Sequence, residues 1–221
     1  MRLLLAGATG LIGQAVMAQW AAAVPGGTLH ALVRRPLAAP PAGVQPLVVD
    51  FSALPALPAA DAALCALGTT IKTAGSQAAF RAVDFDAVLA FARAAQASGV
   101  RRFAVVSALG ASARSGGFYN RVKGEMEAAV TALGFETLLI ARPSLLTGDR
   151  SALGQPPRRA EALAQTLMAP LGSLLPAAWR PIAGETVARA LLHALHTAPA
   201  GVQVLDNGRL HHAGSQEGKR P

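Results

Sequence analysis

Three glycines spaced three residues apart near the N-terminus restrict this chain to a small set of folds. The apolar segment Arg2–Ala6 runs directly into Gly7-Ala8-Thr9-Gly10-Leu11-Ile12-Gly13, and an alanine-rich segment, Leu11–Ala23, follows. In a strand-to-helix turn, the first glycine allows the tight turn and the second lets the backbone approach a pyrophosphate, while the third lets the helix pack closely on the strand. The free amides at the start of the helix then bind the phosphates. The loop predicts dinucleotide binding, and the alternative is a tight turn without a ligand.

Short apolar segments alternate along the chain with longer, alanine-rich segments of helical spacing. The expected strands are Arg2–Ala6, Thr28–Val33, Gln45–Val49, Ala62–Leu67, Arg102–Ser107, Thr137–Ala141 and Val202–Leu205. The expected helices are Leu11–Ala23, Gln77–Ser98, Tyr119–Leu133, Arg159–Met168 and Glu185–His196, with a frayed tail from about His211. This alternation is typical of an α/β fold. We expect one domain over residues 1–221, with a Rossmann-type doubly wound parallel sheet in 1–145 and a small C-terminal cap on the substrate side in 146–221.

Composition excludes several classes of protein. Of the 221 residues, 52% are hydrophobic and 14% are charged, which excludes a disordered chain and a coiled coil. The single cysteine, Cys65, rules out a disulfide framework and a cysteine-based zinc site, and we expect no metal. Because no basic leader with a long apolar segment is seen, we expect a cytoplasmic protein. The uncharged stretch Ala162–Trp179 is interrupted by prolines, so we expect no transmembrane segment, while peripheral membrane contact stays open.

The net charge of +8 raises the question of nucleic-acid binding. The basic residues come as separated pairs, and aromatic residues are only 5% of the chain, too few for a base-stacking surface. We therefore expect no specific nucleic-acid partner, although the charge favours anionic small molecules. The sequence does not indicate an oligomeric state.

The end of the second expected strand bears on which dinucleotide is bound. A site for NAD usually has Asp or Glu there to hold the ribose 2′-hydroxyl. Here Arg34 and Arg35 follow the strand, and an arginine can bind a 2′-phosphate through two hydrogen bonds. We expect NADP, with NAD as the alternative. Asp50, after the third strand, is placed either to bind the adenine amino group or to cap the turn at Phe51-Ser52.

The only tyrosine of the chain lies four residues before one of its three lysines. Tyr119 and Lys123 therefore share one face of an expected helix. An ammonium beside a phenol favours the phenolate, so such a tyrosine can exchange a proton while a nicotinamide exchanges a hydride. The alternative is a surface tyrosine with a solvated lysine. Ser107, at the end of the preceding strand, is a candidate for orienting the substrate oxygen, or a serine bonded to backbone.

With these motifs, the sequence resembles the short-chain dehydrogenase/reductase superfamily. The glycine spacing is similar to that of its extended and atypical branches. Leu67-Gly68-Thr69-Thr70, Val105–Ala111 and Tyr119–Glu125 resemble the Tat-interacting-protein-like atypical members, and the resemblance runs from Arg2 to about Val204. One departure is Ala108, since relatives often carry a second hydroxyl residue after Ser107.

The resemblance implies a site. Gly68, Thr69 and Thr70 would lie against the cofactor, Tyr119 would be the acid/base, and Lys123 would also hold the nicotinamide ribose, with Pro143 and Ser144 beside the nicotinamide. The expected catalytic residues are Tyr119, Lys123 and Ser107. The expected cofactor contacts are Gly7, Thr9, Gly10, Leu11, Ile12, Gly13, Arg34, Arg35, Asp50, Gly68, Thr69, Thr70, Tyr119, Lys123 and Pro143.

Together these features predict an NAD(P)(H)-binding oxidoreductase that prefers NADP(H) and transfers a hydride to or from a small carbonyl or hydroxyl substrate. Two alternatives stay open. One is a nucleotide-binding regulatory or assembly protein without turnover, because some atypical members of the superfamily act in that way. The other is an NAD(P)-dependent epimerase or dehydratase, although the short segment after Pro143 leaves little room for a sugar-nucleotide site.

Overall fold

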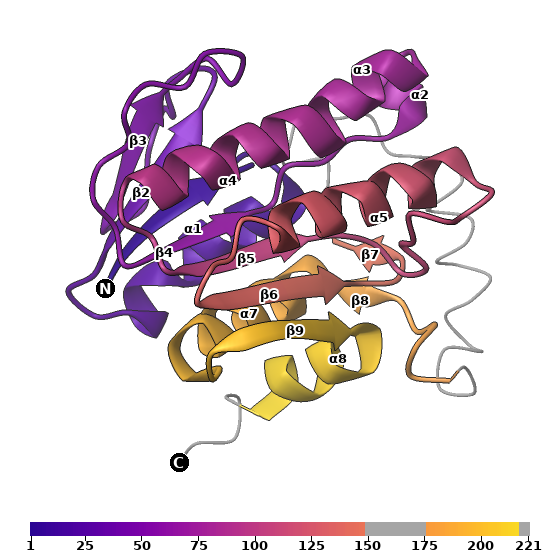
Figure 1. Ribbon diagram of the computed structural model, residues 1–221. Helices are drawn as coiled ribbons and strands as arrows, with labels where there is room; N and C mark the ends of the chain where they lie inside the picture. Colours follow the sequence, from indigo (N-terminus) through magenta and orange to yellow (C-terminus); the bar gives the residue numbers. More distant parts are fainter. Residues whose placement is uncertain (149–175, 217–221) are drawn as a thin grey trace.

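Residues 1–148 and 176–216 are those that the structure, a computed structural model, describes, and they form a central sheet with helices on both faces (Figure 1). The strands of this sheet are β1 (Arg2–Ala6), β2 (Thr28–Val33), β3 (Val44–Val48), β4 (Ala62–Cys65), β5 (Arg102–Val106), β6 (Thr137–Arg142) and β9 (Gly201–Asp206). All are parallel, in the order β3-β2-β1-β4-β5-β6-β9. The chain extends the sheet from β1 in one direction and from β4 in the other, as in a doubly wound Rossmann fold. The predicted fold class is confirmed.

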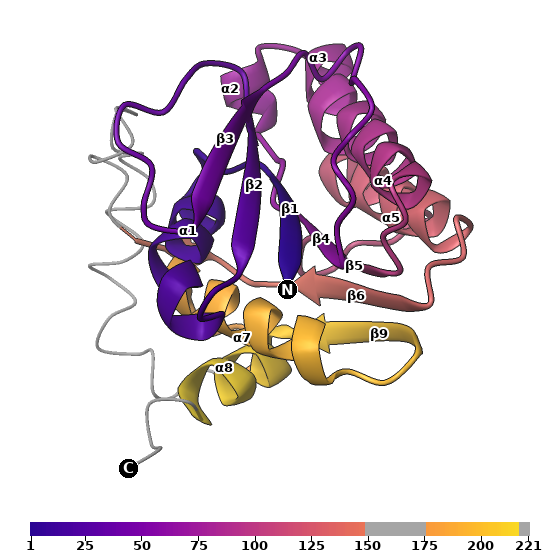
Figure 2. The ribbon, with the colours of Figure 1, turned by 90° about the vertical axis from the view of Figure 1, so that its left-hand side faces the viewer.

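The helices lie in two layers, one on each face of the sheet (Figure 2). One face is covered by α1 (Leu11–Ala23) and α7 (Gly184–Thr197), and the other by α4 (Val88–Ala97) and α5 (Phe118–Thr131). Next to α7 lies α8 (Asn207–Gln216). The remaining elements are α2 (Ile71–Ala74), α3 (Gln77–Arg81), the π-helical segment η1 (Ala82–Ala87) and a small second sheet of β7 (Leu146–Thr147) and β8 (Ile182–Ala183).

Two hydrophobic cores fill the spaces between the sheet and its helices. Successive side chains of a strand point to opposite faces, so Leu3 and Leu5 pack toward α1 and α7, whereas Leu4 packs toward α4 and α5. Trp20 of α1 and Phe91 of α4 are completely buried, one in each core. Burial on both faces explains why these strands are almost continuously apolar.

Most expected elements match the observed ones within a few residues, and three differ. The helix expected over Gln77–Ser98 is divided into α3, η1 and α4, because the π-helical turn breaks its regular hydrogen bonding. The strand expected to reach Leu67 ends at Cys65, where the chain leaves the sheet to form the wall of a cavity. The tail expected from His211 is part of α8, which is held in place by the completely buried Leu210.

Two further expectations concern the C-terminal part of the chain. The strand expected at Val202–Leu205 is β9, which pairs with β6 at the edge of the main sheet. Residues beyond 145 therefore contribute to the main sheet and its helix layer. The helix expected at Arg159–Met168 lies outside the described residues. Within the described ranges, no helix combines the length and the apolar character that crossing a bilayer requires.

Candidate functional site

A cavity of about 300 Å³ lies at the carboxyl ends of β1, β4 and β5. This is the end of the sheet at which open α/β proteins bind their ligands. Its walls come from the glycine loop, the loop after β4, the segment η1, the first turns of α5 and the loop after β6. The lining residues are Gly10, Leu11, Ile12, Ala66, Leu67, Gly68, Thr69, Thr70, Thr73, Asp84, Val106, Ser107, Tyr119, Lys123, Ser144, Leu145 and Leu146.

Each of the three loop positions requires glycine for a different structural reason. Gly7 has a φ of +84°, and a Cβ there would lie 2.4 Å from the carbonyl of Ala66. A Cβ at Gly13 would lie 2.1 Å from the carbonyl oxygen of Gly7, so this glycine allows α1 to pack on the strand-to-helix turn. At Gly10 the nearest atom would be the Gly7 oxygen at 3.4 Å, and this residue lines the cavity. Only the second glycine thus keeps space clear on the ligand side.

The start of α1 offers backbone donors to this cleared space. The helix has no side-chain cap at Gly10 and no acidic residue in its first turn. Leu11 and Ile12, its first two residues, line the cavity. The amides of a first turn have no partner within the helix, and the helix dipole favours an anion there. The loop and the helix start therefore fit the pyrophosphate of a dinucleotide.

Tyr119 borders the cavity at the start of α5. Its ring packs against Phe80 of α3, with the ring centroids 5.3 Å apart, and Phe80 is itself completely buried. The residue as a whole stays 37% exposed. The ring is thus held by its aromatic neighbour while part of the residue remains open to a ligand.

Lys123, one helical turn further, is buried in an ion pair. Its Nζ lies 2.8 Å from Oδ1 of Asp84, and it donates to the carbonyl oxygen of Val106 at 3.5 Å. Asp84 is completely buried, and its Oδ2 accepts a hydrogen bond of 2.8 Å from the backbone N–H of Thr69. The expected pair of Tyr119 and Lys123 does meet at one cavity, and the lysine is not solvated.

Asp84 is the site residue that the sequence reasoning missed. A signal for it was present in the sequence. Asp84 lies four residues after Phe80 and four before Val88, both completely buried, so it is an acid on the apolar face of an expected helix. A charged residue on such a face is almost never fully buried unless it is paired.

Ser107 follows β5 and lies at the cavity with its side chain buried. Its backbone N–H donates to the carbonyl of Ala141, but its Oγ has no hydrogen-bond partner among the described residues. A buried hydroxyl without a partner costs about 1–3 kcal/mol. The hydroxyl is therefore free to bind a polar group of a ligand.

The other predicted cofactor residues fall into two groups. Gly68, Thr69 and Thr70 line the cavity, as does Ser144 after β6. Thr9, Arg34 and Arg35 are exposed, and neither they nor Pro143 are among the lining residues. The structure thus brings most of the predicted set together around one space.

Asp50 shows the turn-capping arrangement of its two alternatives. Its Oδ1 accepts hydrogen bonds from the hydroxyl of Ser52 at 2.7 Å and from the backbone N–H of Ser52 at 2.8 Å. Both bonds lower the pKa of Asp50 below its usual value, and the bond from the hydroxyl has the larger effect. Asp50 is exposed, and both bonds go to one of its oxygens, which leaves the other outside this turn.

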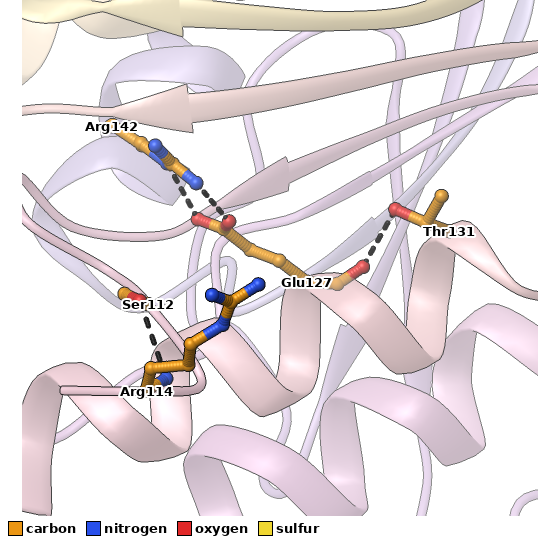
Figure 3. A network of polar contacts seen from close by, with 5 residues as sticks. All are labelled: Ser112, Arg114, Glu127, Thr131 and Arg142. Carbon is orange, nitrogen blue, oxygen red and sulfur yellow. Dashed lines mark hydrogen bonds and ion pairs between the residues drawn. The ribbon is translucent and has the colours of Figure 1, made fainter.

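A second ion pair fixes the helix that carries Tyr119 and Lys123. Nε and Nη2 of Arg142, at the end of β6, donate to the two carboxylate oxygens of Glu127 of α5 at 2.9 and 2.5 Å (Figure 3). The hydrogen bonds and the charge of Glu127 raise the pKa of Arg142 above its usual value. The pair joins α5 to the strand that leads into the Ser144 wall of the cavity.

The described part of the chain contains neither a reactive thiol nor a cluster of metal-ligating side chains. Burial raises the pKa of Cys65 to about 12, so its thiol stays neutral at physiological pH. No group of three or more His, Cys, Asp or Glu side chains gathers within residues 1–148 and 176–216.

Comparison with known proteins places the chain in a family. The family described as NAD(P)H-binding matches residues 7–154. The protein HTATIP2 of Rattus norvegicus is 38% identical over 175 residues, which cover 76% of this chain and 69% of that protein. FMP52 of Eremothecium gossypii, named as mitochondrial, is 38% identical over 155 residues, which cover 68% of each chain. The solved structure of the human epimerase family protein SDR39U1 with NADPH has a TM-score of 0.62 at 20% identity, and covers 100% of this chain and 81% of that one.

The names of these relatives correct one prediction. A cytoplasmic location was expected, and it is wrong, because several FMP52 relatives are named as mitochondrial proteins. The expectation was based on the lack of a secretory leader, which bears on secretion and does not distinguish the cytoplasm from an organelle.

The family match starts at the glycine loop, and two relatives share 38% identity with the chain over 68% or more of its length. The structure adds the doubly wound sheet and the cavity at its carboxyl edge. The chain therefore belongs to the NAD(P)H-binding family, as an atypical short-chain dehydrogenase/reductase of the HTATIP2-like group.

Proposed function

We propose that the protein is an NADP(H)-dependent oxidoreductase that reduces a small carbonyl compound or oxidises the corresponding alcohol. The observation that carries the proposal is the meeting of Tyr119, Lys123 and Ser107 at one cavity, next to the glycine loop. A proton donor, a cation and a free hydroxyl are the groups that a carbonyl oxygen and a ribose require. Bound NADP(H) would supply the hydride, and the protein would supply the remaining tasks.

Each of the three side chains has one task. Tyr119 gives a proton to the carbonyl oxygen in reduction and takes it from the hydroxyl in oxidation. Lys123 lies in an ion pair with Asp84 and donates to Val106, and its remaining N–H groups hold the nicotinamide ribose. Ser107 donates its unpartnered hydroxyl to the substrate oxygen.

The preference for NADP over NAD rests on Arg34 and Arg35. Both are exposed directly after β2, where an acidic residue would mark an NAD site, and no acidic residue stands there. A guanidinium binds a 2′-phosphate through two charged hydrogen bonds. Replacing both with alanine should remove about 1.5–3 kcal/mol per lost charged hydrogen bond from NADPH binding, with little effect on NADH.

Fluorescence titrations of NADPH and NADH into the parent protein and the double variant test this preference. Arg93→Ala, which removes an exposed arginine from α4, controls for the loss of positive charge alone. Equal affinity of the parent protein for NADPH and NADH would refute the role of Arg34 and Arg35.

Turnover is tested with Tyr119→Phe, which removes one oxygen atom and keeps the ring that packs on Phe80. Across a panel of aldehydes and ketones, NADPH oxidation should fall by roughly 10²–10⁴-fold, while the Kd for NADPH stays within about twofold. Lys123→Met should weaken both binding and turnover, and Lys72→Met, at an exposed lysine, serves as its matched control. No turnover by the parent protein on any substrate would favour a nucleotide-binding regulator instead.

A further inference from the structure

Asp84 belongs to none of the sequence motifs that point to this site, yet it lines the cavity. It stands on η1, the π-helical segment between α3 and α4, and its exposed surface is zero. π-Helical turns are rare and often occur at functional sites. A carboxylate buried to this degree needs charged and hydrogen-bonding partners to remain ionised.

The two oxygens of Asp84 have separate partners on two other elements. Oδ1 lies 2.8 Å from Nζ of Lys123 on α5, and Oδ2 accepts from the backbone N–H of Thr69 in the loop after β4 at 2.8 Å. Both partners line the cavity. The side chain of Asp84 thus fixes both the loop at Thr69, which forms a wall of the cavity, and the ammonium of Lys123.

Within the described part of the chain, the ion pair of Lys123 is with Asp84, while Glu127, one turn further on α5, pairs with Arg142. Among the cavity-lining residues, Asp84 is the only acidic side chain and Lys123 the only basic one. The nearby thiol of Cys65 on β4 stays neutral, since burial raises its pKa to about 12. Tyr119, the third titratable side chain at the cavity, lies on the same helix as the lysine. The carboxylate of Asp84 therefore balances the ammonium.

Gly68 keeps the cavity side of this pair open. A Cβ at Gly68 would lie 3.4 Å from Oδ1 of Asp84 and 3.8 Å from Nζ of Lys123. The absence of a side chain there leaves room for a ligand beside the Lys123 ammonium. Lys123 donates one hydrogen bond, to Val106, and pairs with Asp84 by charge, so its ammonium keeps N–H groups for that ligand.

We propose that Asp84 is a positioning residue, which pairs with the ammonium of Lys123, directs it at the ribose of the bound dinucleotide and fixes Thr69 beside it. The identity of the ligand rests on the proposed function. The ion pair itself exists without the ligand and is tested without it.

The test is competitive acetylation of the full-length protein with acetic anhydride, quantified for each lysine by mass spectrometry. Only an uncharged amine reacts, and the chain has three lysines, so exposed Lys72 serves as the internal standard. In the parent protein without cofactor, Lys123 should react slowly relative to Lys72. In Asp84→Asn the buried amine loses its charged partner, and the Lys123 to Lys72 ratio should rise by about tenfold or more.

Asp86→Asn is the matched control, because Asp86 lies in the same segment, carries the same charge and is exposed. Its labelling ratio should stay within about twofold of the parent value, which screened surface charges imply. An unchanged ratio in folded Asp84→Asn overturns the proposal. So does an equal rise in Asp86→Asn, since any lost negative charge would then have the same effect.

A second comparison covers the case in which Asp84→Asn does not fold. Adding Lys123→Met to it removes the lone ammonium, and we expect the thermal unfolding midpoint lost in the single variant to be regained. A double variant as unstable as Asp84→Asn alone overturns the proposal. In the parent protein, NADPH should also slow acetylation of Lys123. Absence of that protection counts against the proposed function, while the cofactor-free ratios still decide the role of Asp84.

Discussion

Replacing the second and third glycines of the loop in turn should separate ligand binding from folding. In Gly13→Ala the new Cβ would lie 2.1 Å from the Gly7 oxygen and 2.7 Å from the Ala8 Cα, both backbone atoms, so α1 has to shift. Overpacking of this kind costs about 1–3 kcal/mol. In Gly10→Ala the nearest atom is 3.4 Å away, and the φ of −82° suits any residue, so the free energy of unfolding should change by less than about 0.5 kcal/mol.

Gly10→Ala should weaken NADPH binding with almost no loss of stability, whereas the main effect of Gly13→Ala should be a loss of stability. The Cβ of Gly10→Ala occupies the space next to the first turn of α1 that a pyrophosphate needs, so the Kd for NADPH should rise about tenfold, or 1.4 kcal/mol. Thermal unfolding without ligand and fluorescence titration with NADPH measure the two effects. For a chain of this size, 1–3 kcal/mol corresponds to a lower midpoint by roughly 2–12 °C in Gly13→Ala. If Gly10→Ala binds NADPH as well as the parent protein, the second glycine serves only the turn.

Two further variants test the packing and the titration of the fold. Glu127→Ala leaves the partly exposed Arg142 guanidinium without its carboxylate, and denaturant unfolding should show a loss of about 1.5–3 kcal/mol in the free energy of unfolding. A loss below about 0.5 kcal/mol would mean that the pair does not hold α5. Burial, followed by the charge of Arg2, lowers the pKa of His30 from 6.5, so the unfolded chain binds this proton more readily. The stability that neutral His30 contributes should be fully present above pH 6.5 and fall as the pH decreases toward the lower native pKa. Thermal unfolding of His30→Gln should show a smaller decline of the midpoint over this pH range. An identical decline in both proteins would exclude His30 as its source.

The parts of the fold that follow from local sequence were predictable. The bounds of α1 follow from the glycine loop at its start, and they are observed as expected. Tyr119 and Lys123 were expected on one helix face, because four residues make about one turn, and they do line one cavity. These conclusions need only the periodicity of one element.

Features that depend on contacts between distant elements were not predictable in the same way. Asp84 meets Lys123 across 39 positions of the sequence only because η1 packs against α5. The division of the helix expected over Gln77–Ser98 depends on the same contact region. Arg142 and Glu127 come together because α5 covers β6, which a reading of either segment alone does not indicate.

The hydrogen bonding of Asp50 and Ser107 could not be predicted from the sequence either. Both residues stand at strand ends, where a polar side chain serves a turn or a ligand equally well. The hydrogen bonds of Asp50 go to Ser52, whereas the Oγ of Ser107 has no partner in the described part of the chain. Only the positions of the neighbouring donors and acceptors distinguish the two cases.

The most direct test of the proposed activity is the transfer of deuterium from NADPH deuterated at C4 of the nicotinamide to the carbinol carbon of the alcohol product. With the parent protein and a reactive aldehyde or ketone, mass spectrometry should find deuterium at that carbon. Tyr119→Phe should bind NADPH nearly as well and lower the rate of transfer by roughly 10²–10⁴-fold. Deuterium transfer at the same rate in both proteins would contradict the role of Tyr119, and NADPH binding without transfer to any carbonyl compound would contradict the proposed reaction.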